Sequence, residues 1–264
     1  MISSCVRRLT NREDGAQRRL FERHREVSAD AYIQWLCTVV GGWLAPTDGN
    51  LRAFAYAISH MPAGGAIVEI GAFLGLSTNI LTYLAITHHR DNPLFTCDPW
   101  MFEGTEQPIG GYFDAGRPAY RDYAREAFKL NTALFSEPRM PYAIEATSER
   151  FFALWQGGAS VTDVFGRPAT LGGPISFAYI DGAHTADAAR RDFLAVDQHL
   201  LPGGLILFDD SADNSTFPEV TRLAAEVASQ PSYTLVFKTP NYFVRKRATI
   251  ATGTSCRLEP EGRG

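Results

Sequence analysis

The sequence predicts an α/β fold: a seven-stranded, mostly parallel sheet with helices on both faces and a helical cap at the N-terminus. Short apolar runs alternate with helical stretches from residue 66 onward, which is typical of a parallel sheet with crossover helices. The last two runs are separated only by residues 239–241, too few for such a helix, so we expect a C-terminal antiparallel hairpin. Residues 1–60 lack the alternation and are expected to form the cap.

Two amphipathic helices are predicted within the cap. In residues 31–43 the apolar side chains recur on one stripe, and a glycine pair ends the pattern. A second helix is expected over 51–58, and it stops near Met61-Pro62 because proline disrupts a helix interior. The cap is therefore expected to be helical throughout its ordered part.

The main domain is predicted to span residues 61–247. Its predicted strands are Ala66–Ile70, Leu94–Cys97, Tyr142–Ala146, Ile175–Ile180, Leu205–Phe208, Tyr233–Lys238 and Tyr242–Arg245. The predicted helices cover 76–87, 119–135, 148–155, 185–200 and 217–229. Two segments rich in glycine and proline, 99–118 and 156–174, are expected to be long loops, either lids over a site or covers for a satellite apolar cluster. The tail, 248–264, is expected to be disordered.

Composition argues against several classes of protein. The chain has 25 basic and 29 acidic residues, a formal charge of −4, whereas a nucleic-acid binder needs a basic face. Its four cysteines are far apart, without the spacing of a zinc site, and are expected to be reduced thiols. No apolar run approaches a membrane span and no signal peptide is recognisable, so we expect a soluble, cytoplasmic protein without a membrane partner.

A glycine-containing turn follows the first predicted strand. Gly71 allows the chain to turn at the strand end, and Gly75 allows a ligand or a helix to approach closely. Ligands of open α/β sheets bind at this edge, although the same spacing also occurs in plain turns. Phe73 stands where the dinucleotide-binding fingerprint has its second glycine, which disfavours a pyrophosphate there. Glu69, inside an apolar strand, needs a polar partner.

Asp98 ends the next predicted strand. A carboxylate at that position can accept hydrogen bonds from the two hydroxyls of a ribose. It could instead cap a turn before Pro99. Together with the glycine turn, Asp98 favours a nucleoside site.

Three carboxylates follow the fourth and fifth predicted strands. If these strands are neighbours, Asp181, Asp209 and Asp210 converge, and their mutual repulsion favours a bound cation such as Mg²⁺. Turn capping and loop stabilisation are the alternative roles. His184, just beyond Asp181, could be a metal ligand, a general base or a loop histidine, whereas Asp192 is expected to be a helix-surface carboxylate.

Three runs carry a resemblance to a known family: EIGAFLGLST at 69–78, IDGAH at 180–184 and LPGGLILFDD at 201–210. Over about residues 60–247 the chain resembles the class I S-adenosylmethionine-dependent methyltransferases, whose Rossmann-like sheet also closes with a hairpin. More narrowly, it is similar to the metal-dependent O-methyltransferases of macrolide-sugar and other natural-product tailoring, including antibiotic biosynthesis.

The resemblance implies a role for each candidate residue. It implies Mg²⁺ ligands at Asp181, Asp209 and Asp210, and His184, with Asp181 beside it, as the catalytic residues. It implies S-adenosylmethionine contacts from the residues around the glycine turn, the ribose-binding carboxylate, the segment after the third strand and the first metal ligand: Glu69, Gly71, Ala72, Gly75, Ser77, Asp98, Ala146, Thr147, Ser148 and Asp181.

The function expected from these observations is methyl transfer to a hydroxyl of a small molecule, a sugar or another natural product. A nicotinamide-dependent oxidoreductase and a catalytically silent interaction module with the same fold are the alternatives. The expected partner is a small hydroxylated acceptor, not nucleic acid or a membrane, and formation of a homo-oligomer is left open.

Overall fold

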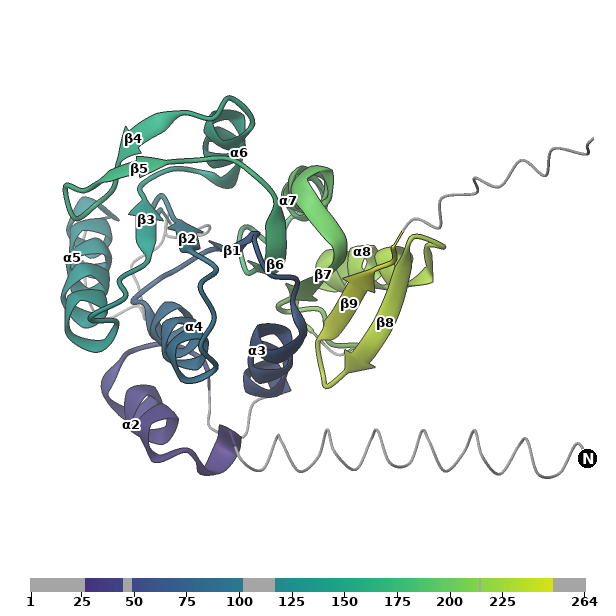
Figure 1. Ribbon diagram of the computed structural model, residues 1–264, viewed down its shortest axis with the longest axis horizontal. Helices are drawn as coiled ribbons and strands as arrows, with labels where there is room; N and C mark the ends of the chain where they lie inside the picture. Colours follow the sequence, from purple (N-terminus) through teal and green to yellow (C-terminus); the bar gives the residue numbers. More distant parts are fainter. Residues whose placement is uncertain (1–26, 45–48, 102–116, 214, 249–264) are drawn as a thin grey trace, which may run out of the picture.

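A seven-stranded sheet forms the centre of the molecule (Figure 1). The computed structural model describes residues 27–44, 49–101, 117–213 and 215–248. The strands of the sheet are β1 (Ala66–Ile70), β2 (Leu94–Cys97), β3 (Tyr142–Ile144), β6 (Ile175–Ile180), β7 (Leu200–Phe208), β8 (Tyr233–Lys238) and β9 (Tyr242–Lys246), in the spatial order β3-β2-β1-β6-β7-β9-β8. The first five strands of this order are parallel, and β9 and β8 add an antiparallel hairpin, which confirms the predicted fold class.

Helices cover both faces of the sheet. The helices are α2 (Ala31–Val39), α3 (Gly49–His60), α4 (Leu76–Thr87), α5 (Arg117–Phe135), α6 (Ser148–Gln156), α7 (Ala186–His199) and α8 (Pro218–Ser229). One apolar core joins α6, α7 and α8 to one face of the sheet, and a second joins α2, α3 and α4 to the other. Neighbouring residues of β1 show the alternation: Val68 belongs to the first core and Ile67 to the second.

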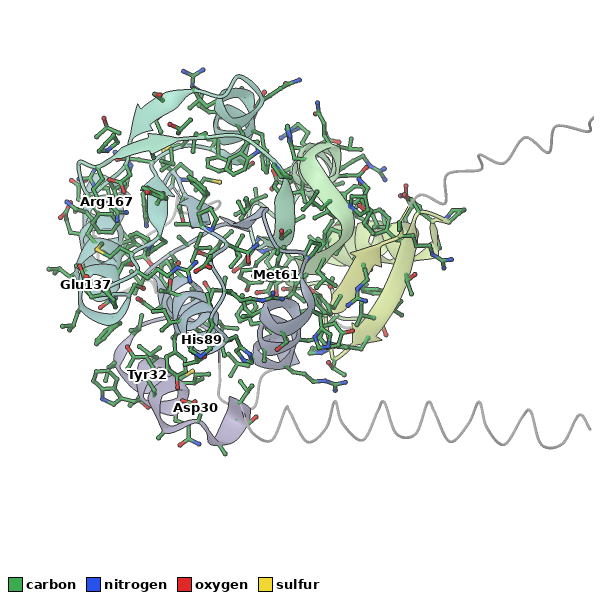
Figure 2. All side chains as sticks on the ribbon, in the orientation of Figure 1. Asp30, Tyr32, Met61, His89, Glu137 and Arg167 are labelled. Carbon is green, nitrogen blue, oxygen red and sulfur yellow. The ribbon has the colours of Figure 1, made fainter. Side chains whose placement is uncertain are left out.

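The helices of the predicted cap pack directly on this second core. Asp30 lies beside Tyr32 at the start of α2 (Figure 2), where its side chain caps the helix by accepting the backbone N–H groups of Tyr32 and Ile33. It also accepts the hydroxyl of Tyr83 in α4. The Tyr32 hydroxyl donates to the backbone carbonyl of Phe135, at the end of α5. Helix α2 and its capping residue are thus tied to α4 and α5 by side-chain hydrogen bonds as well as apolar contacts.

The segment 156–174 differs from the predicted loop. It contains a small antiparallel pair, β4 (Ser160–Thr162) and β5 (Pro168–Thr170), joined by a turn in which Asp163 accepts the backbone N–H groups of Phe165 and Arg167. Strands of three residues are too short to show an alternating pattern. Phe165 packs against the apolar cluster around Trp100 and Phe128, in agreement with the prediction that this segment covers a satellite apolar cluster.

Two other predictions can be compared only in part. Residues 249–264 of the predicted tail and 102–116 of the first loop lie outside the described residues. None of the helices in the described part of the chain combines the length and the apolar character that a membrane span requires.

Candidate functional site

The glycine turn lies against the loop that carries Asp181. Gly71 has a φ of 88°, and a Cβ added there would lie 2.0 Å from the backbone oxygen of Asp181, so only glycine fits. Gly75, with a φ of 91°, precedes α4, and a Cβ there would lie 3.1 Å from the Phe128 ring of α5. Gly71 thus allows the β1 and β6 ends to meet, and Gly75 allows close helix approach.

Glu69 lies fully buried beneath this turn. The Thr78 hydroxyl of α4 donates to its Oε2 at 2.5 Å, which supplies the expected polar partner. Its other oxygen, Oε1, is buried without a hydrogen-bond partner among the described residues. Burial raises the pKa of the carboxyl to about 7, although the hydroxyl groups of Ser77, Thr78 and Thr96 oppose the shift. Glu69 therefore supports the turn from beneath, where it joins β1 to the start of α4.

Asp98 is tied to the glycine turn. Its Oδ2 accepts the backbone N–H groups of Ala72 and Phe73 at 2.8 and 2.9 Å, and its Oδ1 accepts that of Trp100 at 2.6 Å. The Trp100 ring nitrogen in turn donates to the backbone oxygen of Phe73. Because a carboxylate has about four acceptor positions, these three bonds leave room for one further donor, such as a ribose hydroxyl. Asp98 thus also caps the turn before Trp100, which was the alternative role predicted for it.

The segment after β3 contributes small side chains next to a buried carboxylate. Ala146 is partly buried, Thr147 caps α6, and the Ser148 side chain lowers the pKa of the Asp192 carboxyl. The prediction of a surface role for Asp192 is wrong, because the side chain points from α7 into the protein and the residue is 3% exposed. Burial raises its pKa to about 6. A Cβ on Gly182 would lie 2.9 Å from its Oδ2, so Asp192 lies directly behind the β6 loop.

Asp181, His184 and Asp210, called here the acid–histidine group, lie at the carboxyl ends of β6 and β7. Their ligating atoms are all within 4.8 Å of one another. His184 Nε2 lies 2.9 Å from Asp210 Oδ2 and 3.9 Å from Asp181 Oδ1, yet it makes no properly directed hydrogen bond within the described chain. The imidazole stacks on Phe217, with ring centres 4.0 Å apart. The expected convergence of the β6 and β7 carboxylates thus includes His184.

Repulsion among the carboxylates is visible at Asp181. Burial first, and then the neighbouring charges of Asp209 and Asp210, raise the pKa of its carboxyl well above the usual range. The side chain remains 34% exposed, so a ligand can reach it. A positive charge in the acid–histidine group would relieve this repulsion.

Asp209 does not join the acid–histidine group. Its Oδ1 accepts the side-chain amides of Asn50 and Asn241, at 2.8 and 2.6 Å, and the backbone N–H of Asp210 at 2.9 Å. Its Oδ2 accepts the hydroxyl of Tyr179. The protein itself therefore satisfies both oxygens. Asn50, Asn241 and Tyr179 had no recognisable signal in the sequence, since each lies in a different element.

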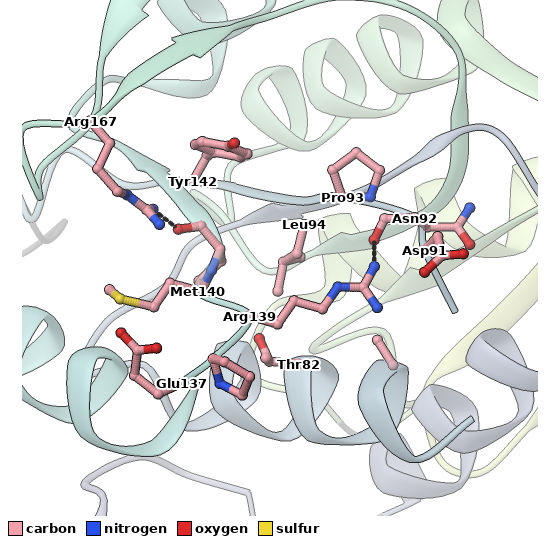
Figure 3. Close-up of a pocket in the computed structure, with 13 residues that line it drawn as sticks. Thr82, Asp91, Asn92, Pro93, Leu94, Glu137, Arg139, Met140, Tyr142 and Arg167 are labelled. Carbon is pink, nitrogen blue, oxygen red and sulfur yellow. Dashed lines mark hydrogen bonds between the residues drawn. The ribbon is translucent and has the colours of Figure 1, made fainter. Parts of the chain in front are cut away.

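A cavity of about 450 Å³ lies away from these residues, at the amino ends of β2 and β3 (Figure 3). Arg139 donates there to the backbone oxygens of Arg90 and Asn92, and Arg167 donates to Pro141 and Asp163. Both guanidinium groups are already engaged by the protein. Ligands of parallel sheets bind at the opposite edge, so the cavity is not the candidate site.

Comparison with known proteins agrees with this geometry. A family model described as a methyltransferase domain matches residues 68–211. Among solved structures, the chain is similar to the SAH-bound methyltransferase PaMTH1 of Podospora anserina, with 14% identity, a TM-score of 0.50 and coverage of 84% of this chain and 88% of that one.

Two other solved structures are more distant in shape. CalS11, a TDP-rhamnose 3′-O-methyltransferase of calicheamicin biosynthesis, is 16% identical, with a TM-score of 0.47 and coverage of 73% and 76%. A putative rRNA methylase of Clostridium thermocellum is 10% identical, with a TM-score of 0.48 and coverage of 76% and 98%. At such identities these likenesses concern the fold alone. The family model, however, covers more than half of the 264 residues, and the chain therefore belongs to the methyltransferase domain family.

Proposed function

We propose that this protein is an O-methyltransferase that transfers a methyl group from S-adenosylmethionine to a hydroxyl of a small molecule, a sugar or another natural product, with the help of Mg²⁺. Membership in the methyltransferase family supports S-adenosylmethionine as the donor. The observation that carries the finer proposal is the acid–histidine group beside the glycine turn. Residues 61–247 would form the catalytic domain, with 1–60 as its cap and 248–264 as a tail.

The donor would bind at the carboxyl edge of β1, β2 and β3. The methionine portion of the donor would lie near Gly71 and Ser77, above the buried Glu69 that supports this turn. The free acceptor position of Asp98 would take a ribose hydroxyl. The backbone of Ala72 and Gly75 would line the turn, and the small side chains of Ala146, Thr147 and Ser148 would border the adenine.

Asp181 and Asp210 would hold the metal. Mg²⁺ is commonly bound by one or two carboxylates and several waters, so this pair suffices and the hydrogen-bonded Asp209 is not needed. Their oxygens suit a hard cation, and a cation there would offset the burial and the neighbouring carboxylate charges that raise the pKa of Asp181. A cation bound there would lower the pKa of a coordinated hydroxyl.

His184 would then act as the general base. The acceptor oxygen would bond to the methyl carbon of the donor as the carbon–sulfur bond breaks, and Nε2 of His184 would take the hydroxyl proton. That nitrogen lies next to both carboxylates and makes no directed hydrogen bond to the described chain, so it is available to an acceptor. Stacking on Phe217 fixes the plane of the ring.

A metal-depletion assay tests this function. S-adenosylhomocysteine release would be measured with a panel of hydroxylated sugars and natural products, before and after treatment with a chelator. We expect turnover with at least one acceptor, loss of most activity on chelation, and recovery with Mg²⁺ or Mn²⁺. Undiminished turnover after chelation would refute the role of the metal. Donor binding with no turnover on any acceptor would favour the silent module.

A further inference from the structure

We propose that Asn50 and Asn241, which together we call the amide clasp, are positioning residues that hold the acid–histidine group in shape through Asp209. This inference rests on the proposed metal-assisted function and adds to it two residues from outside the β6 and β7 loops. It also assigns Asp209 the role of an acceptor within the protein instead of a metal ligand.

The clasp joins elements that are distant in sequence. Asn50 lies in the first turn of α3, and Asn241 lies in the turn between β8 and β9. Both side-chain nitrogens donate to the same oxygen, Asp209 Oδ1, and Asn241 Nδ2 also lies 3.0 Å from Asn50 Oδ1. Both residues are buried, at 2% and 8% exposure, so water does not compete for these bonds.

Close backbone packing fixes the position of the clasp. A Cβ added to Gly49, just before Asn50, would lie 1.4 Å from the backbone oxygen of Thr239. The start of α3 therefore rests directly on the turn that carries Asn241. The cap helix and the C-terminal hairpin meet at this point, and Asp209 is the acceptor that they share.

The clasp acts on the acid–histidine group through the backbone of Asp210. Asp210 has a φ of 50°, in the left-handed region that disfavours residues other than glycine. Its N–H donates to Asp209 Oδ1, and the next N–H, of Ser211, donates to Asn241 Oδ1 at 2.9 Å. One asparagine thus binds both sides of the strained residue, whose carboxylate faces His184 at 2.9 Å.

Tyr179 links the clasp to the second carboxylate of the group. Its hydroxyl lies between Asp209 Oδ2 and Asp181 Oδ2, the latter at 3.2 Å. The hydroxyl has one proton to donate, and Asp209 is the nearer acceptor. Movement of Asp209 would therefore disturb both Asp210 and Asp181. Removing an outer hydrogen-bond partner of a metal site typically weakens metal binding by about 10–100-fold.

The test uses the full-length variants Asn50→Ala and Asn241→Ala, with Asn92→Ala as a matched control. Asn92 is also a buried asparagine, and its amide donates to the backbone oxygens of Pro62 and Gly65 at the other edge of the sheet. Mn²⁺ binding would be measured by electron paramagnetic resonance, and S-adenosylhomocysteine binding by calorimetry. Thermal unfolding would give the loss of stability for each variant.

We expect both clasp variants to bind Mn²⁺ at least about tenfold more weakly than the wild type while their S-adenosylhomocysteine affinity is unchanged. Asn92→Ala should lose stability but keep the wild-type Mn²⁺ affinity. Wild-type Mn²⁺ affinity in both clasp variants would overturn the proposal. If Asn241→Ala fails to fold, Asn50→Ala still decides the matter, because Asp209 Oδ1 then retains two donors.

A crystal structure of Asn50→Ala without metal separates this proposal from the proposed function. If the wild type binds no Mn²⁺, the metal-assisted function fails, yet the clasp predicts that Asp210 leaves the left-handed conformation in the variant and that its carboxylate moves away from His184. An Asp210 turn identical to that of the wild type would overturn the clasp.

Discussion

Replacing Asp98 with asparagine should both destabilise the protein and weaken donor binding. Asp98→Asn keeps the shape of the side chain but replaces one of the two carboxylate oxygens with an NH₂ group. That group cannot accept the N–H groups that Asp98 now holds, which belong to Ala72, Phe73 and Trp100. Phe73 and Trp100 both have positive φ values, of 45° and 49°, so these bonds hold strained backbone in place.

The size of the effect follows from these three bonds. A hydrogen bond to a charged group contributes about 1.5–3 kcal/mol, and a neutral one about 0.5–1.5 kcal/mol. If the amide oxygen of the asparagine accepts the N–H groups of Ala72 and Phe73, the hydrogen bond from Trp100 is lost. The two remaining hydrogen bonds then go to a neutral group instead of a charged one. The charge of Asp98 is itself costly to bury, as its raised pKa indicates, which offsets part of this loss. We therefore expect a net destabilisation of about 3 kcal/mol.

Urea unfolding and calorimetric titration with S-adenosylhomocysteine would measure the two effects. Donor affinity should fall by about 10–100-fold, equivalent to about 1.4–2.8 kcal/mol. Asp163→Asn is the matched control, because that buried carboxylate also accepts two backbone N–H groups, in the turn between β4 and β5. It should lose comparable stability and keep the donor affinity. Unchanged stability and donor affinity in Asp98→Asn would refute this reasoning.

Three further predictions concern other residues of the site. The pKa of Asp192 is about 6 in the fold against an ordinary 3.8, so the native state binds the extra proton between these values. The contribution of Asp192 to the unfolding free energy of the protein should therefore decrease by about 3 kcal/mol as the pH rises from about 4 to about 6, and then level off. Protonation of Glu69 changes stability in the same direction up to about pH 7. The contribution of Asp192 is therefore measured by urea unfolding of Asp192→Asn and of the wild type at each pH. If the unfolding free energies of the two proteins depend on pH in the same way, the prediction for Asp192 is wrong. His184→Ala should reduce kcat by about 10²–10⁴-fold with unchanged S-adenosylhomocysteine and Mn²⁺ affinity, as steady-state kinetics and titrations would show. A loss of Mn²⁺ affinity instead would make His184 a metal ligand. Gly71→Ala should destabilise the protein by about 1–3 kcal/mol or more, because the residue has a left-handed φ and the added Cβ would lie 2.0 Å from a backbone oxygen. A variant that unfolds at the same temperature as the wild type would disprove the close packing.

Most of the sheet could be predicted because its strands are buried runs bounded by clear turns. Ala66–Ile70, Leu94–Cys97, Ile175–Ile180 and Tyr233–Lys238 were predicted with the bounds that the structure has. The start of β7 at Leu200, five residues earlier than predicted, could not be read because Pro202, Gly203 and Gly204 have the composition of a turn. Composition near a strand end does not determine where pairing begins.

Asp98, Asp181, Asp209 and Asp210 could be predicted to gather because each comes after a strand, and parallel strands end at one edge. What each carboxylate contacts could not be predicted. The partners of Asp209 come from α3, β6 and the β8–β9 turn, and asparagine in such places has no distinctive pattern. Asp192 was misjudged because one helical position does not reveal whether it faces solvent or the back of a loop.

The most direct test of the account is a crystal structure of the protein with S-adenosylhomocysteine and Mn²⁺, with an anomalous difference map to locate the manganese. The account predicts the nucleoside over the Gly71–Gly75 turn, with its ribose at Asp98, and a manganese peak at Asp181 and Asp210. A nucleoside bound in the cavity lined by Arg139 and Arg167, or a manganese peak away from these two carboxylates, would contradict it.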